Sequence, residues 1–194
     1  VAPDEGGNGT MSMRSATLDF NRVDKTVHLD RDVQISRDKQ SVSADQAVAH
    51  LSADEEHLDL LELRGNSKVG GTPAASGGLE SLTGRDMDLH YGGESSVLQR
   101  AVINGDAFLR LAGEQAQSGR TIAASTMTIG LGTDGATVSE LVARDNVRVS
   151  LPGEGGTATR TIAAQALDST GDGSKGLTGA HFAGNVQFAE KGNG

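Results

Sequence analysis

The chain has 194 residues, of which 26 are acidic and 17 basic, and its formal net charge is −9. An acidic chain with only 3% aromatic residues is poorly suited to binding nucleic acid, because phosphate contacts need clustered Lys and Arg. Net charge alone disfavours an anionic membrane surface as well. The absence of cysteine excludes disulfides, thiolate catalysis and cysteine-ligated zinc.

The sequence shows no membrane-spanning or targeting segment. No apolar stretch approaches the roughly 18–20 residues that span a bilayer. Residues 1–7 have neither the basic nor the apolar region of a signal peptide. We therefore expect that any signal peptide or membrane anchor has been removed or never existed.

A short pattern recurs five times along the chain. Apolar residues alternate with polar ones, an Asn or Asp follows, and the alternation then resumes. The segments are residues 27–35, 61–69, 101–109, 141–149 and 180–188, with the anchors Asp32, Asn66, Asp106, Asn146 and Asn185. The anchors are 34, 40, 40 and 39 residues apart, which indicates a repeat architecture.

Within each repeat, the apolar residues share one parity. Positions five and three before the anchor, and one and three after it, are apolar everywhere except at Ser67. On a β-strand these positions face one side, and such alternation predicts a half-buried strand. The residue before four anchors is Gly65, Gly105, Asp145 or Gly184, and glycine inside a strand is typical of a bulge or bend. We predict strands of about nine residues, each bent in the middle.

Each recurring segment has a shorter apolar partner before it. In chain order these partners are residues 18–20, 47–51, 87–91, 127–131 and 162–167. Turn-forming residues at 21–25, 52–56, 92–93, 132–135 and 171–173 separate each partner from the recurring segment that follows it. Glycine-rich stretches at 70–78 and 152–156 predict loops between repeats. Five hairpins then give roughly ten strands. An unclosed row of hairpins leaves unpaired edges near residues 13–36 and 157–188, which are templates for strand addition.

This hairpin resembles the OstA-like repeat, which builds the lipopolysaccharide-transport proteins LptA and LptC and the periplasmic part of LptD. The likeness is carried by the apolar-x-apolar, Gly-Asn-Val-x-apolar pattern, clearest at 141–149 and 180–188. It covers about residues 13–188 and implies an all-β fold in which repeated hairpins form a twisted, open β-jellyroll with a V-shaped section. That range would form a single domain, with a flexible N-terminal segment at 1–12 and a flexible tail at 189–194.

The resemblance also implies a non-enzymatic function without a cofactor. OstA-like domains bind lipopolysaccharide, or a similar acylated glycolipid, in the periplasm and carry it between the inner and outer membranes. Neighbouring OstA-like transport proteins, or further copies of the chain, would join head to tail by strand addition. LptC members carry an N-terminal membrane helix and LptA members a signal peptide, so the type of member, and any tether to the inner membrane, stay open.

The inside of the V would hold the acyl chains of lipid A. Several inward positions carry alanine, among them Ala101, Ala107 and Ala143, and small side chains either bring the layers close or leave room for a ligand. The expected lining residues are Leu18, Phe20, Leu29, Leu63, Met87, Leu89, Ile103, Leu109, Met127, Ile129, Val147, Val149, Phe182 and Phe188. The alternative is a structural β-repeat of surface or adhesin type, whose interior is filled by side chains. A third reading is a repeat-type enzyme acting on polysaccharide, which would need clustered acids on one exposed face.

No catalytic or metal site is predicted. The five histidines show no metal-ligand spacing, and His28 and His181 occupy the same polar column, four residues before the anchor. The acidic runs at 54–56 and 168–172 fall in expected turns. The glycine-rich residues 153–156 lack the Lys and the following helix of a phosphate-binding loop.

Overall fold

A computed structural model of the chain describes residues 2–3, 10–37, 40–71, 76–92, 97–113, 119–153, 158–173 and 175–192. All its regular elements within these residues are β-strands. They are β1 (Ala2–Pro3), β2 (Thr10–Arg14), β3 (Thr17–Asn21), β4 (Thr26–Arg37), β5 (Gln40–Leu51), β6 (Leu58–Gly70), β7 (Leu79–Gly92), β8 (Val97–Leu111), β9 (Arg120–Leu131), β10 (Val138–Pro152), β11 (Ala158–Asp172), β12 (Gly176–Ala183) and β13 (Gln187–Gly192).

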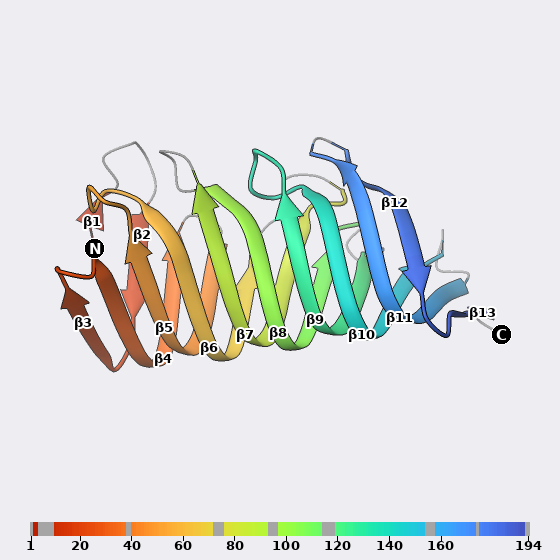
Figure 1. Cartoon of the computed structure of the whole chain (residues 1–194), viewed down its shortest axis with the longest axis horizontal. Helices are drawn as coiled ribbons and strands as arrows, with labels where there is room; N and C mark the ends of the chain where they lie inside the picture. Colours follow the sequence, from red (N-terminus) through yellow and green to blue (C-terminus); the bar gives the residue numbers. More distant parts are fainter. Residues whose placement is uncertain are drawn as a thin grey trace.

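The strands form one antiparallel sheet in which β4 to β12 pair in chain order (Figure 1). At the two ends, β2 and β3 both pair with β4, and β12 and β13 both pair with β11. Among the described strands, the pairing does not return from the last ones to the first, so the sheet is open. The predicted all-β fold of repeated hairpins in an open sheet is confirmed.

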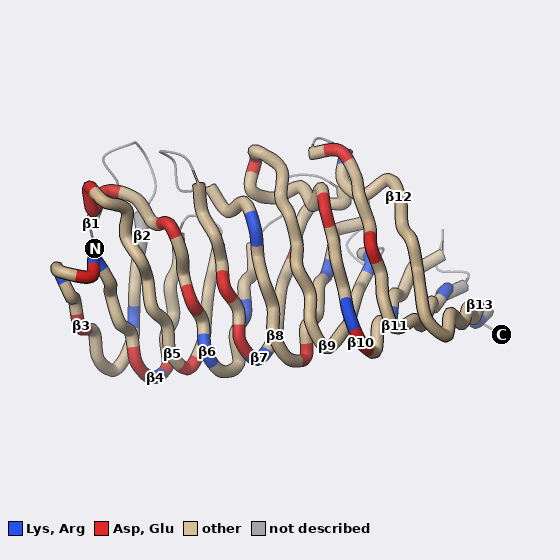
Figure 2. The backbone as a smooth tube through the Cα atoms, viewed as in Figure 1, with Lys and Arg blue, Asp and Glu red and all other residues tan. Residues whose placement is uncertain are grey.

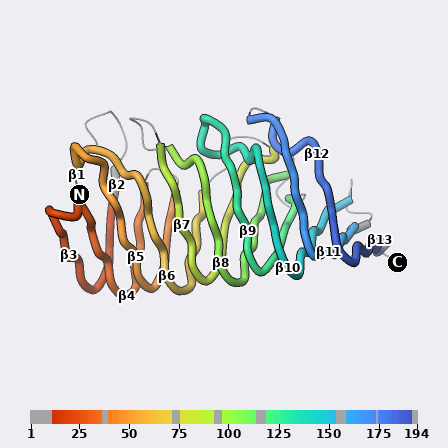
Figure 3. Tube along the Cα trace, viewed as in Figure 1, coloured from red at the N-terminus to blue at the C-terminus, as the bar shows by residue number. Residues whose placement is uncertain are grey.

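Each long strand bends in the middle, so that the single sheet folds into two facing layers (Figure 3). The front layer of Figure 1 holds β3, β12 and one half of each strand from β4 to β11. These halves pair side by side from β3 to β12, beginning with residues 26–30 of β4 and 46–51 of β5. The back layer holds β2, β13 and the other halves, such as residues 33–37 and 40–44. The long strands have 12–15 residues, more than the predicted nine, because the ladder continues on both sides of the bend.

The bend is made by two consecutive residues with positive φ in every second strand. These pairs are Arg31–Asp32, Gly65–Asn66, Gly105–Asp106, Asp145–Asn146 and Gly184–Asn185. Glycine adopts this left-handed conformation without cost, and Asn and Asp tolerate it better than other residues do. The recurring anchors are therefore the second residue of each bend, and the predicted mid-strand bend is confirmed.

The bend explains the single parity of the repeat. Of the twenty positions expected to face inward, fifteen are buried, including Ser67, whose hydroxyl donates to the carbonyl of Arg85 at 3.0 Å. The exceptions are Val27, Ala180, Phe182, Val186 and Phe188. Four of these five belong to the last repeat, which lies at the end of the sheet and has no further strand to cover it.

The paired strands extend beyond the predicted range of 13–188. Part of the segment expected to be flexible belongs to β1 and β2, and β13 continues to Gly192. The turns predicted at 52–56 and 132–135 lie between strands, as do residues 22–25 of the turn predicted at 21–25. The turn predicted at 171–173 is misplaced, because β11 continues through Asp172, and the acidic run at 168–172 therefore lies in that strand rather than in a turn. Residue 93, residues 72–75 of the loop expected at 70–78 and residues 154–156 of the loop expected at 152–156 lie outside the described residues.

Candidate functional site

Two unbroken rows of apolar side chains face each other between the layers. Directly paired residues on neighbouring strands point to the same side of a sheet. The front row is Leu18, Leu29, Ala47, Leu63, Met87, Ile103, Met127, Ala143, Leu167 and Phe182. The back row is Met13, Ile35, Val42, Val69, Leu82, Leu109, Ile122, Val149, Ile162 and Phe188. Nine strand spacings of about 4.8 Å make each row roughly 43 Å long.

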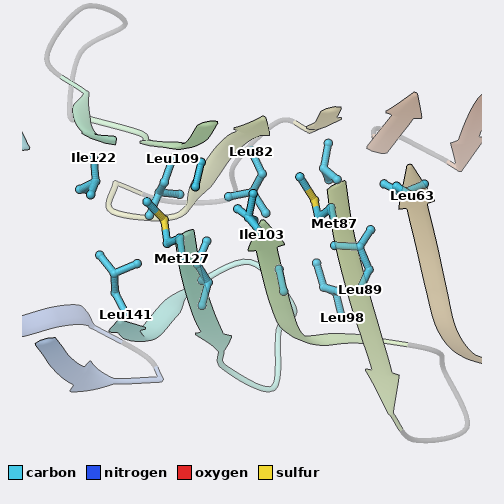
Figure 4. Close-up of a cluster of buried hydrophobic side chains, with 14 of the residues drawn as sticks. Leu63, Leu82, Met87, Leu89, Leu98, Ile103, Leu109, Ile122, Met127 and Leu141 are labelled. Carbon is cyan, nitrogen blue, oxygen red and sulfur yellow. The ribbon is translucent and has the colours of Figure 1, made fainter. Parts of the chain in front are cut away.

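The predicted lining residues divide between the middle and the two ends of the interior. In the middle, side chains from both layers pack together in one cluster (Figure 4). Ten of the fourteen residues are only 0–5% exposed: Leu29, Leu63, Met87, Leu89, Ile103, Leu109, Met127, Ile129, Val147 and Val149. The middle of the interior is therefore filled by the protein's own side chains in this structure.

The other four predicted residues lie at the two open ends. At the N-terminal end, Leu18 is 55% exposed and Phe20 49%, beside Met13 at 42%. At the C-terminal end, Phe188 is 62% exposed, and Phe182 is half-buried. Their exposure follows from position, because β3 and β12 pair on one side only. Large apolar side chains gathered at an exposed edge are typical of a binding surface.

Sequence reasoning missed the back-layer half of the partner strands. Val42, Leu82 and Ile122 face the interior there, whereas only the front-layer halves of their strands were predicted. Ile162, at the matching place of β11, begins the predicted partner 162–167. The four residues are spaced 40 apart. That spacing equals the repeat length, so a search for a second apolar column at the same period would have found them.

Opposite the bends, main-chain contacts join the two layers across the mouth of the V. Gly78, next to β7 in the back layer, pairs with Thr137, next to β10 in the front layer. The N–H of Leu79 donates to the carbonyl of Ala136 at 2.8 Å. We call residues 78–79 and 136–137 the mouth latch. It holds the rims of the V together near the middle of the molecule.

Glycines let the turns around the mouth latch pack closely. A Cβ on Gly132 would stand 2.5 Å from the carbonyl oxygen of Gly173, so the two turns touch through their backbones. Gly135 has a φ of 65°, and a Cβ there would stand 2.7 Å from a methyl group of Val97. Larger residues at these positions would push the neighbouring turns of the front layer apart.

The outer face of the front layer carries a network of ion pairs. Arg64 donates to Asp88 at 2.6 Å and to Glu62 at 2.7 Å, and His50 lies 3.1 Å from Glu62. Burial lowers the pKa of Arg64, but the hydrogen bond and charge of Asp88 outweigh it and raise the pKa overall. The pairing recurs eighty residues later between Arg144 and Asp168 at 2.6 Å.

This recurrence indicates that the ion pairs support the repeat. Arg64 and Arg144 also donate to the carbonyl groups of their own preceding residue and of the neighbouring strand, at 2.9–3.3 Å. Each guanidinium therefore ties two adjacent strands together on the outer face. His28 and His181, which share a repeat column, are both exposed on this face as expected.

One group of possible metal ligands lies in the β5–β6 turn. Ligand atoms of Asp54, Glu56 and His57 lie within 4.8 Å of one another. Among the described residues, this is the group of three acidic or histidine side chains close enough to share one metal ion. Asp54 accepts the hydroxyl of Ser52 and the N–H of Glu56, and these bonds lower its pKa. The same bonds account for the shape of the turn.

Two hollows of about 580 Å³ each, on the surface of the described residues, both lie outside the layers. One lies over β8–β10, between Arg100 and Glu140, where Gly130 has no side chain. The other lies at the bends and is lined by residues such as Asp30, Asp45 and Arg64. Neither hollow contains a predicted lining residue.

The bends, the apolar interior and the unpaired ends define the class of protein: an open, bent antiparallel sheet of hairpin repeats, as in a β-jellyroll. No protein-family model matches the chain, and no curated protein matches its sequence. In fold it is similar to LptH, the LptA-homologous periplasmic component of the lipopolysaccharide transport device of Pseudomonas aeruginosa. The TM-score is 0.49 with 9% sequence identity, covering 62% of this chain and 76% of that one. Among the described residues, no helix is long and apolar enough to span a bilayer.

Proposed function

We propose that the chain binds the acyl chains of lipopolysaccharide, or of a similar acylated glycolipid, and carries it through the periplasm between the two membranes. The observation that supports this most strongly is the pair of facing apolar rows. Each crosses ten strands without a polar residue, and its end residues are exposed, apart from the half-buried Phe182. A sealed core would need no apolar ends. An apolar path open at both ends suits a ligand that is passed along.

Acyl chains would enter at the ends and continue inward as the layers separate. Leu18 and Phe188 are accessible now, whereas Met87 and Ile129 are covered by other side chains. The bends at the base of the V act as hinges in this proposal, and the mouth latch limits how far the rims part. Apolar burial of roughly 0.8 kcal/mol per CH₂ provides the affinity.

A structural β-repeat with a filled core is the second candidate. The ten predicted lining residues with 0–5% exposure favour it, since that packing leaves no space for a ligand. A fluorescent fatty-acyl probe separates the two candidates. A transport protein takes up the probe with a saturable affinity, whereas a filled structural module excludes it.

The expected partners are further copies of the chain, or other OstA-like proteins, joined head to tail. Successive strands alternate in direction from β3 to β12, so these two edge strands run in opposite directions. β12 of one copy would therefore continue the antiparallel ladder when placed beside β3 of the next. The apolar rows of the two copies would then join into one longer path.

Photo-crosslinking tests lipid binding directly. A photoreactive residue at Phe182 or Ile129, both facing inward, should form an adduct with purified lipopolysaccharide. The matched control is His181, which neighbours Phe182 but is exposed on the outer face. Adducts at Phe182 and Ile129 with none at His181 support the proposal. The absence of adducts at every inward position contradicts it.

Sedimentation velocity tests the head-to-tail partner. Leu18→Lys with Phe20→Lys adds charge to the exposed apolar side chains of β3, and should abolish concentration-dependent self-association. Val23→Lys is the control, because Val23 is 90% exposed in the following turn and belongs to neither row. A chain that stays monomeric at all concentrations, or a control with the same effect, contradicts self-association through this edge.

A further inference from the structure

The outer face of the back layer is free of acidic residues in its two central rows. The first row is Arg14, Gln34, Ser43, Lys68, Thr83, Phe108, Ala123, Arg148, Ala163 and Gln187. The second row is Ser12, Ser36, Ser41, Gly70, Ser81, Arg110, Thr121, Ser150, Thr161 and Ala189. We call these twenty residues the basic face. It carries four cationic side chains, although the whole chain has more acids than bases.

The matching rows of the front layer have the opposite character. Their twenty residues include six acids, namely Asp19, Asp30, Glu62, Asp86, Asp88 and Asp168. The two arginines among them, Arg64 and Arg144, are both held in ion pairs. Figure 2 shows acidic positions crowding the front strands and the lower edge, with basic positions on strands behind them. Folding therefore separates charges that are mixed along the sequence.

Most cations of the basic face are available to a partner. Arg14, Lys68 and Arg148 are exposed and form no ion pair within the part of the chain that the structure describes. Arg110 is the exception, with Glu80 at 2.9 Å. Phe108 is half-buried in the same row, between Lys68 and Arg148. The remaining positions are Ser, Thr, Ala, Gly and Gln, so a flat surface can approach the sheet closely.

The acidic front layer does not cancel this charge at close range. Stacked sheets lie about 10 Å apart, and the outer side chains add to that separation. The Debye length at physiological ionic strength is about 8 Å, so charges on the far face are largely screened. A surface that touches the basic face therefore meets a positive potential despite the net charge of −9.

We infer that the basic face docks on the surface of an anionic phospholipid bilayer. Along the first row, Arg14, Lys68 and Arg148 are three and four strand spacings apart, roughly 14 and 19 Å. Duplex nucleic acid carries a charge every ~1.7 Å and favours clustered cations, which the basic face lacks. A broad, flat face with spaced cations and a central aromatic side chain suits a layer of lipid headgroups. This inference goes beyond acyl-chain binding and does not depend on it.

Vesicle flotation tests the inference on the full chain. Wild-type protein should float with phosphatidylcholine vesicles that contain phosphatidylglycerol, and should not float with phosphatidylcholine alone. High salt should weaken the binding about tenfold or more, as expected for screened charges. Lys68→Glu with Arg148→Glu should weaken it about tenfold as well, because both side chains are exposed and the change reverses the charge of the face.

The matched control makes the same change in charge on the other side of the molecule. Arg100→Glu with Lys175→Glu alters two exposed cations of the front layer and its turn, and should bind as wild type does. The inference is overturned if wild type does not float, if the control loses binding equally, or if the basic-face variant binds unchanged. It is also overturned if the basic face instead drives salt-dependent self-association or nucleic-acid binding. Uptake of a fatty-acyl probe by wild type, the Lys68→Glu, Arg148→Glu variant and the control variant is measured in parallel. If none of the three proteins takes up the probe, the proposed function is contradicted, but the membrane inference is not.

Discussion

The backbone N–H of Leu79 donates to the carbonyl oxygen of Ala136 at 2.8 Å, joining the two rims of the V opposite its bends. If acyl chains enter as the layers part, fixing this contact should block them. Gly78→Cys with Thr137→Cys places two thiols on a directly opposed pair. Such pairs have Cα atoms about 4.5–5.5 Å apart, within the range that disulfides bridge. The oxidised variant should bind a fatty-acyl probe about tenfold more weakly, measured by fluorescence titration.

The chain offers a simple control for this lock. It contains no other cysteine, so the introduced pair is the source of any intramolecular disulfide. Adding reductant should restore uptake to the level of the two single-cysteine variants. Equal uptake by the oxidised and reduced forms would show that opening at the mouth latch is not needed.

Leucines in the same apolar row should differ in their contribution to stability. Leu63→Ala removes a side chain with 0% exposure and should lower the free energy of unfolding by about 2–5 kcal/mol, because a cavity remains. Leu18→Ala is the matched change at the open end, where the side chain is 55% exposed, and should cost less than about 1 kcal/mol. Urea unfolding of both variants measures the difference. Similar losses would mean that the end is as well packed as the middle.

The bend at Gly65 should require glycine. Its φ of 73° disfavours any L side chain by roughly 1–2 kcal/mol, and a Cβ there would meet the carboxylate of Asp45. Gly65→Ala should therefore destabilise the fold by at least that amount in urea unfolding. Gly70→Ala in the same strand is the control, because its Cβ would meet only the Ser41 hydroxyl, at 3.3 Å. A neutral Gly65→Ala would contradict the role given to the left-handed pair.

Acid should remove the contribution of Asp86 to stability. The N–H of Gly65 donates to its carboxylate at 3.1 Å and lowers its pKa, partly opposed by burial and helped by Arg85. Because the folded pKa is below the unfolded one, the stabilisation is present at neutral pH and is lost as the pH falls below about 4. Asp86→Asn should be less stable than wild type at pH 7 and nearly equal at low pH. An unchanged difference across the pH range, from urea unfolding, would contradict this assignment.

Much of the fold could be predicted because the same strand-and-bend pattern recurs five times in the sequence. The anchors from Asp32 to Asn185 each sit at a bend, and the parity around them places the same side chains inward. The back-layer halves of β5, β7 and β9, and residues 158–161 of β11, were missed because their apolar columns, such as Val42 and Leu82, stand apart from any anchor. Ten of the fourteen expected lining residues lie in one interior and four at its ends, and their degree of burial was not predictable. Whether Ala101 and Ala143 leave space depends on how closely the opposite layer approaches.

The sequence by itself determined the strands, the bends and the side of each strand that turns away from water, since these follow from local alternation and from residues that tolerate positive φ. Only the tertiary structure decided how the layers meet. The mouth latch joins residues 78–79 to 136–137, which no local pattern relates. The basic face likewise unites Arg14, Lys68 and Arg148, because pairing across ten strands aligns positions that are far apart in the chain. Net charge is a sum over the chain, whereas a neighbouring surface responds to the charges that folding turns toward it.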